Sequence, residues 1–265
     1  GLDLNQWQTL IQHPRTPLVY RAISGQYAPG STFKMIVALA ALEAGVISAD
    51  HRVFCSGRIK FGDRFFHCWK KDGHGELSLV NAIEQSCDVH FYDVARRTGI
   101  DRIGRMANRF GLGTPTGIEL EGEEEGLVPT RAWKRKRRDQ PWQQGETLVS
   151  GIGQGYLLVT PLQLAVMSAQ IANGGFRVKP TLILADPKAV VRQDIEDKLE
   201  GGDHQISVPQ VSIGLSTASL ALVRRAMDMV SNSPYGTAYR SRIVDPAMAI
   251  AGKTGTVQVR RITKL

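Results

Sequence analysis

The chain has 265 residues, 42% of them hydrophobic, so it is long enough to bury a substantial core as one large domain. Its 27 glycines and 12 prolines favour a loop-rich α+β or α/β enzyme over a helical bundle. No apolar run reaches the roughly 18 residues that a membrane-spanning helix needs, which excludes a transmembrane segment within this sequence.

The net charge of +8 comes largely from one run, KRKRR at residues 134–138. Such a run is typical of a solvated loop, and no aromatic-rich RNA-binding motif accompanies it. Attraction to anionic lipid headgroups or to an acidic polymer is equally compatible with the charge. We therefore predict no nucleic-acid function and leave the role of the run open.

The first strong helical signal begins after the turn-rich residues 26–30 and covers residues 32–44, with Gly45 as a natural stop. Residues 35–42 are apolar on every face, which predicts a buried central helix. The next segment, residues 50–76, is rich in aromatic, glycine and charged residues and is expected to be irregular.

The remaining elements follow from caps and residue type. Thr160 and Pro161 supply an N-cap and a first-turn proline, and Ser216 or Thr217 caps a later helix. Small and β-branched residues at the C-terminal end predict a buried strand. The predicted helices are 79–85, 88–99, 101–110, 160–174 and 216–230, the charged stretch 186–212 is expected to be an insertion, and the strand is 247–259.

Three short motifs carry the chemistry: STFK at residues 31–34, SCD at 86–88 and KTGT at 253–256. Each is common on its own. In this order they form a serine acyl-transfer set, in which a serine nucleophile is activated by a lysine.

Ser31 and Lys34 lie three positions apart, so a helix places both side chains on one face. The helix start offers free N–H groups that favour developing negative charge. A lysine buried in this apolar helix, with the cation Lys253 nearby, holds its proton less tightly, which suits a proton acceptor for Ser31. The alternative is an ordinary helix-capping serine with a lysine one turn later.

The second motif falls at the junction of two helices, where a bend can project Ser86 into a cleft. We expect Ser86 to relay a proton between Lys34 and the leaving amine, and Asp88 to cap the following helix.

The third motif supplies substrate contacts on the predicted strand. Gly255 leaves room for a peptide to lie alongside, and Lys253, Thr254 and Thr256 offer groups that bind a carboxylate. The backbone N–H groups of Ser31 and Thr256 are expected to form the oxyanion hole.

The chain resembles the penicillin-binding transpeptidase domains, in particular the cell-elongation type of class B enzyme in Gram-negative bacteria. The resemblance covers nearly all of the chain and is carried by GQYAPGSTFK at 25–34, WKKDGHG at 69–75, GIGQGY at 151–156 and AGKTGT at 251–256. Aspartate rather than asparagine at position 88 fits the elongation type rather than the division type.

The resemblance implies a serine β-lactamase-like fold, with an antiparallel sheet flanked by helices and a helical lobe, filling residues 1–265. It implies a D,D-transpeptidase that cross-links peptidoglycan stem peptides through a Ser31 acyl-enzyme and is acylated by β-lactams. Members act at the periplasmic face of the inner membrane with a membrane glycan polymerase of the shape, elongation, division and sporulation group. They also carry an N-terminal anchor and pedestal, further C-terminal strands and a helix, so we expect this chain to be a truncated form.

All three cysteines, Cys55, Cys68 and Cys87, fall in one window with His74. These residue types match a structural Cys3His zinc site, and some Gram-negative relatives that this chain resembles carry a metal-binding cluster here. A metal on Cys87 would brace Ser86 and Asp88 from behind. A disulfide or buried free thiols remain alternatives. Competing ligands for the fourth position are His67, His51, His90 and Asp63.

Two other functions share these features. A serine β-lactamase or β-lactam sensor domain uses the same nucleophile set, but the sequence shows no motif specific to either. A non-catalytic scaffold that binds a polymer through the basic run would carry the serine motifs as vestiges.

Overall fold

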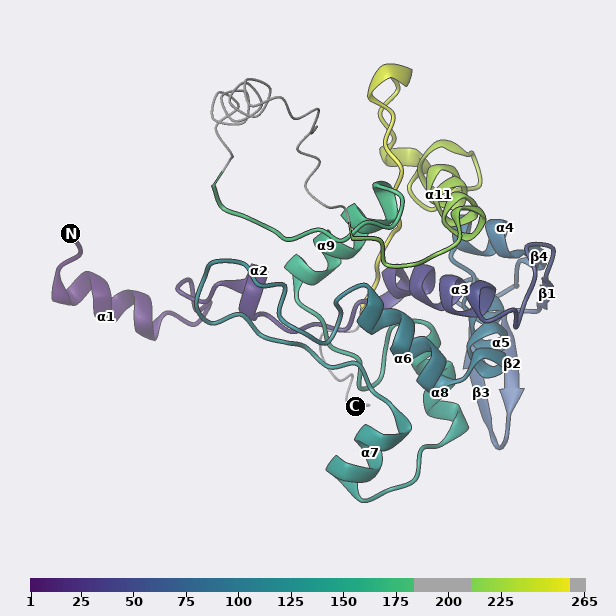
Figure 1. Ribbon diagram of the computed structural model, residues 1–265, viewed down its shortest axis with the longest axis horizontal. Coiled ribbons are helices and arrows are strands. Elements are labelled where there is room, and N and C mark those ends of the chain that lie inside the picture. Colours follow the sequence, from purple (N-terminus) through teal and green to yellow (C-terminus); the bar gives the residue numbers. More distant parts are fainter. Residues whose placement is uncertain (184–210, 258–265) are drawn as a thin grey trace, which may run out of the picture.

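The computed structural model describes residues 1–183 and 211–257, and several of its helices pack around the buried helix α3 (Figure 1). The elements in chain order are α1 (Leu4–Gln12), α2 (Arg21–Ser24), η1 (Gly30–Phe33), α3 (Lys34–Glu43), β1 (Arg52–Cys55), β2 (Arg58–Phe61), β3 (Arg64–His67), β4 (Gly75–Ser78), α4 (Leu79–Glu84), α5 (Asp88–Thr98), α6 (Ile100–Arg109), α7 (Arg131–Arg138), α8 (Gln144–Gly151), α9 (Pro161–Ala172), α11 (Thr217–Asn232), η2 (Tyr239–Ser241) and η3 (Pro246–Met248).

Helix α3 is the centre of the core, as its all-round apolar sequence predicts. Every residue from Lys34 to Ala41 is buried, and the helix packs against α5, α6 and α11. The residues just before it form the 3-10 turn η1, so the α-helix begins two residues later than expected. Helices α5 and α8 pack closely on each other, and α4 packs on α11. In the described residues, no helix is both long and apolar enough to span a membrane.

The other predicted helices are confirmed within the described residues. Thr160 caps α9 through a capping box with Gln163, and Pro161 occupies its first turn. Ser216 caps α11 by accepting from the Ser219 N–H. The predicted insertion at 186–212 lies almost wholly outside the described residues.

The region expected to be irregular instead forms two small antiparallel sheets. Strands β2 and β3 pair from Arg58 opposite His67 to Phe61 opposite Arg64, joined by the two-residue turn Gly62–Asp63. Strands β1 and β4 pair outside this hairpin. A two-residue connection with glycine at positive φ is a favoured hairpin turn, and Gly62 has φ +57°. The expectation of irregular structure was therefore wrong.

Two further predictions were wrong. The basic run is helical in α7, because Thr130 caps the helix through the Trp133 N–H and Arg and Lys are good helix formers. Residues 247–257 contain no strand: part of the segment is the turn η3, and the described residues beyond it have no strand partner. Small and β-branched residues favour a strand only where a neighbouring strand receives them.

The turn before α3 depends on a close approach of two glycines. Gly30 donates its N–H to the Gly153 carbonyl at 2.8 Å. Gly153 has φ +74°, and a Cβ on it would lie 2.0 Å from the Gly30 oxygen. Neither position accepts a side chain without moving the backbone that carries Ser31.

We expect Gly153→Ala to lower the free energy of unfolding by about 3 kcal/mol or more, because it combines an unfavourable φ with a backbone clash. The control is Gly45→Ala, where φ is +62° but nothing lies within 4 Å of the added Cβ. That variant is expected to lose only about 1 kcal/mol. Urea unfolding measures both, and equal losses would show that the Gly30–Gly153 contact contributes nothing.

Candidate active site

Residues from all three motifs line one cavity of about 670 Å³. Ser31 comes from η1, Ser86 from the turn between α4 and α5, and Asp88 from the first position of α5. Thr254 and Thr256 come from the C-terminal segment. The structure therefore brings together motifs that lie far apart in the sequence.

Lys34 is fully buried, and its ammonium group has three acceptors. Nζ donates to the Ser86 carbonyl at 2.8 Å, to the Ser86 hydroxyl at 3.2 Å and to Asp88 Oδ1 at 2.8 Å. A buried charge is tolerated only where an opposite charge and hydrogen bonds compensate it, and Asp88 provides the charge. Lys34 is therefore buried as the sequence predicts, but it forms an ion pair with Asp88 that the sequence analysis did not anticipate.

Asp88 does not cap α5 as expected. The N-cap is Cys87, whose sulfur accepts from the His90 N–H. Asp88 instead uses its second oxygen to accept from the Trp69 N–H at 3.0 Å. Its carboxylate is thus held by Lys34 on one side and by the chain after β3 on the other.

The Ser86 hydroxyl lies between two lysines. It accepts from Lys34 and, at 2.9 Å, from Lys253 Nζ. Ser86 is buried and has φ +55°, a strained conformation for a residue other than glycine that costs about 1–3 kcal/mol. Backbone strain of this kind concentrates at functional sites.

Lys253 also donates to the Thr254 carbonyl at 3.0 Å, and the Thr254 hydroxyl meets that of Thr237 at 2.7 Å. Burial, followed by the charge of Lys34, lowers the pKa of Lys253 to about 7, although Asp88 acts in the opposite direction. Near neutral pH this lysine therefore exchanges its proton readily.

The third motif lies directly against the nucleophile turn. A Cβ on Gly255 would lie 3.2 Å from the Thr32 methyl group, and one on Gly30 would lie 2.6 Å from the Thr256 carbonyl oxygen. Gly255 thus permits close packing on the turn, in a segment that forms no strand.

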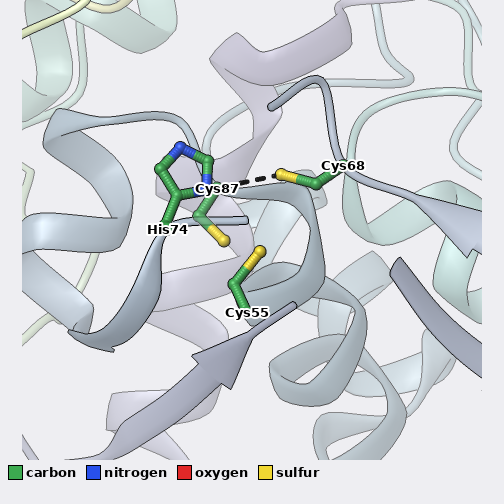
Figure 2. Close-up of side chains that lie close together, drawn as sticks. All are labelled: Cys55, Cys68, His74 and Cys87. Atoms are coloured by element: carbon green, nitrogen blue, oxygen red, sulfur yellow. Dashed lines mark hydrogen bonds between the residues drawn. The ribbon is translucent and has the colours of Figure 1, made fainter. Parts of the chain in front are cut away.

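A second cluster lies behind the second motif, where Cys55, Cys68, Cys87 and His74 converge (Figure 2). Their potential ligand atoms all lie within 4.8 Å of one another. The Cys68 sulfur and His74 Nδ1 are 3.6 Å apart, and all three cysteines are buried free thiols. The competing candidates His67, His51, His90 and Asp63 are not part of the cluster found among the described residues.

The thiols of this cluster interact strongly. A hydrogen bond from Cys87 lowers the pKa of Cys68, and the same hydrogen bond, together with burial, raises the pKa of Cys87. The cluster also contacts the active site, because the Asp88 N–H donates to the Cys68 sulfur at 3.4 Å.

Sequence reasoning missed five residues that line the active-site cavity: Trp69, Tyr92, Ile152, Gln154 and Thr237. Trp69, Ile152 and Gln154 lie within the stretches that carry the family resemblance, and that signal alone makes them candidates. Tyr92 is one turn after Asp88 on α5. Thr237 has no local signal and is placed only by the fold.

Residues 3–261 match the family model described as the penicillin binding protein transpeptidase domain. The chain belongs to this family. It is 37% identical over 261 residues to the peptidoglycan D,D-transpeptidase MrdA of Escherichia coli K12, covering 98% of this chain and 40% of that protein. The chain thus spans less than half the length of that relative.

Solved structures agree with this membership. Pseudomonas aeruginosa PBP2 in complex with WCK 5153 superposes with a TM-score of 0.84 at 38% identity, covering 98% of this chain and 54% of that one. PBP2 from Helicobacter pylori in complex with MreC gives 0.84 at 33% identity, covering 98% and 45%. The penicillin-binding transpeptidase fold is thereby confirmed.

We expect the stability difference between the wild type and Lys253→Met to change with pH. The folded pKa of Lys253 is about 7 against an ordinary value of 10.5, so the unfolded chain binds more protons between these values. Stability from this group therefore rises with pH across that window. Urea unfolding at about pH 6 and about pH 9 should show that the free energy of unfolding of the wild type, relative to that of the variant, is larger at the higher pH. A flat or falling difference would contradict the lowered pKa.

Proposed function

We propose that residues 1–265 form a peptidoglycan D,D-transpeptidase domain that acts through a Ser31 acyl-enzyme. The observation that carries the proposal is the chain of contacts from Lys34 through the Ser86 hydroxyl to Lys253, in the cavity that Ser31 lines. The name of the Escherichia coli relative supports the same reaction.

In the proposed acylation, the Ser31 hydroxyl attacks the penultimate D-Ala carbonyl of a stem peptide. Lys34 first passes a proton through Ser86 to Lys253, which can accept it because its pKa of about 7 leaves a fraction of this lysine neutral near neutral pH. Neutral Lys34 then takes the Ser31 proton, and the amine of the terminal D-Ala leaves with a proton relayed by Ser86.

Substrate binding uses the third motif. Protonated Lys253 and the hydroxyls of Thr254 and Thr256 hold the terminal carboxylate, and Gly255 lets the peptide approach. The N–H groups of Ser31 and Thr256 stabilise the oxyanion. β-Lactams imitate the D-Ala-D-Ala end and leave a slowly hydrolysed adduct on Ser31.

Incubation with a penicillin should add one molecule of drug to the protein, seen by intact-protein mass spectrometry. Ser31→Ala is expected to give no adduct, because it removes the only atom that forms the bond. Ser168→Ala, at an exposed serine of α9, is the matched control and should be acylated like the wild type.

A stable adduct on the wild type would support the transpeptidase over a β-lactamase. Rapid turnover of the drug would favour the hydrolase, and an intact fold without any adduct would favour a non-catalytic scaffold.

We also propose that Cys55, Cys68, His74 and Cys87 bind a structural zinc ion. Three sulfurs and one imidazole form a common tetrahedral zinc set, in which sulfurs lie roughly 3.8 Å apart given Zn–S bonds of about 2.3 Å. The cluster needs little contraction to reach that geometry, and His74 directs Nδ1 toward the sulfurs, 3.6 Å from that of Cys68 (Figure 2). Four protein ligands leave no position open for chemistry, so the metal would only hold the second motif in place.

Protein purified without chelator should contain about one zinc per chain by elemental analysis. Cys55→Ser, which removes a ligand not adjacent to the catalytic motifs, should lose the metal and lower both the unfolding temperature and the rate of acylation by penicillin. Metal-free wild-type protein that unfolds at the same temperature as the metal-loaded protein would contradict the structural role.

The proposed setting is cell elongation at the periplasmic face of the inner membrane. The partner would be a membrane glycan polymerase of the shape, elongation, division and sporulation group. The likeness to PBP2 proteins, one of them solved in complex with MreC, supports this assignment.

A further inference from the structure

Helix α7 carries much of the positive charge of the chain and has no part in the proposed acylation. It lies at the edge of the molecule, away from the core helix α3 (Figure 1). Its eight residues include six Lys and Arg side chains, of which Lys134 alone is buried. Like charges this close repel one another, so the helix is more stable when anions lie against it.

Three of the exposed cations form one stripe along the helix. Arg131, Arg135 and Arg138 recur at intervals of four and three residues, which places them on one face. Arg131 has a single distant carboxylate partner, because its Nε lies 3.5 Å from Asp101. Arg135 and Arg138 form no ion pair and no side-chain hydrogen bond with the residues that the structure describes. The charge of this stripe is therefore open to a ligand.

Part of the stripe forms one wall of a cavity of about 550 Å³. The residues that line it are Arg131 and Arg135 from α7, and Pro141, Trp142, Gln144 and Thr147 from the chain that leads into α8 and from α8 itself. The cavity thus combines two guanidinium groups with an indole ring and an amide. None of the three acyl-transfer motifs contributes to it.

The start of α8 is fixed to α7 by contacts around this cavity. Trp142 donates its indole N–H to the Thr147 hydroxyl at 2.8 Å. Lys134, on the inner side of α7, pairs with Glu146 at 2.6 Å and lies 6.0 Å from the centroid of the Trp142 ring. Glu146 uses its other oxygen to accept from the Gln143 N–H at 2.8 Å. A ligand therefore meets a preformed site rather than a loose loop.

The residue types of the cavity indicate the chemistry of its ligand. Guanidinium groups bind carboxylates through two parallel hydrogen bonds, and two of these groups lie one turn apart here. An indole ring and an amide suit the apolar faces and amides of a peptide or an N-acetylated sugar. A flat lipid surface would use the charge but not the cavity. A polymer of sugars and carboxylate-bearing peptides would use both.

We infer that α7 and its cavity bind a strand of peptidoglycan outside the cavity that Ser31 lines. The inference rests on the proposed transpeptidase function, which identifies the polymer. Arg131 and Arg135 bind carboxylates of stem peptides that are not reacting, and Trp142 packs against the polymer. The surface holds the strand while stem peptides enter and leave the Ser31 cavity, and no covalent step occurs on it.

The test measures co-sedimentation of the protein with purified, insoluble peptidoglycan after treatment with penicillin, which blocks Ser31 and so removes binding through the proposed active site. One portion of the polymer is coupled to ethanolamine with a carbodiimide, which converts its carboxylates to neutral amides. The variants are Arg131→Gln combined with Arg135→Gln, and Arg135→Gln alone. The matched control combines Arg224→Gln with Arg225→Gln, which removes two exposed arginines from α11.

The wild type is expected to sediment with the native polymer at low salt, and much less at high salt or with the amidated polymer. The double variant on α7 should lose about fivefold in affinity, or about 1 kcal/mol, as expected for two exposed ion pairs. Arg135→Gln alone should lose about twofold. The control on α11 should bind like the wild type. Equal losses in the two double variants, or no loss in the variant on α7, would overturn the inference.

Vesicles of equimolar phosphatidylcholine and phosphatidylglycerol are the second probe. Loss of vesicle binding but not of polymer binding in the α7 variants would assign the surface to lipid and overturn the inference.

Mass spectrometry of the penicillin adduct in the same samples tests the proposed function separately. A chain that is acylated but does not bind the polymer overturns only the inference. A chain that binds the polymer through α7 but never forms the adduct supports the binding surface and overturns the transpeptidase.

Discussion

The buried ammonium group of Lys34 is the interaction on which the site depends. Lys34 lies at the start of an apolar helix and has no exposed surface. An uncompensated charge at such a position costs several kcal/mol. Its acceptors are Asp88 and the carbonyl and hydroxyl of Ser86, all from one short segment. The second motif must therefore stay fixed against α3 for the core to tolerate its lysine. The same three hydrogen bonds therefore compensate the buried charge and hold the first and second motifs together.

The features that fix this segment lie on its far side. Ser86 has a strained backbone, so its conformation persists only because its neighbours hold it. Cys87 caps α5, Cys68 accepts from the Asp88 N–H, and Trp69 holds the second Asp88 oxygen. Cys87 and Cys68, both members of one buried cluster, thus hold the backbone that directly follows Ser86. Binding of a metal by that cluster would stiffen the active site without taking part in its chemistry.

How much of the fold and the site can be predicted from the sequence depends on whether the signal is local. Most of the core helices, though not α7 or α8, follow from caps and residue type, and the motifs predict Ser31 and Lys34 as the nucleophile and its base. The β2–β3 hairpin has a readable signal in Gly62–Asp63, which the aromatic and charged composition around it obscured. The segment at 247–257 is different, because a strand exists only with a partner strand. Thr237 and the pairing of Asp88 with Lys34 arise from contacts distant in sequence, and no local pattern encodes them.

The two lysines of the site are not equivalent, and the difference bears on substrate choice. Asp88 forms an ion pair with Lys34, while Lys253 has no carboxylate partner within the described residues. Burial, followed by the charge of Lys34, lowers the pKa of Lys253 to about 7, and the charge of Asp88 offsets only part of that fall. A substrate carboxylate placed beside Lys253 would restore the balance and favour its protonated form. In the proposed mechanism, the proton that Lys253 then takes through Ser86 would come from Lys34, which would become the base that Ser31 needs. On the proposed mechanism, a substrate ending in a carboxylate is therefore bound and activates the nucleophile in the same step.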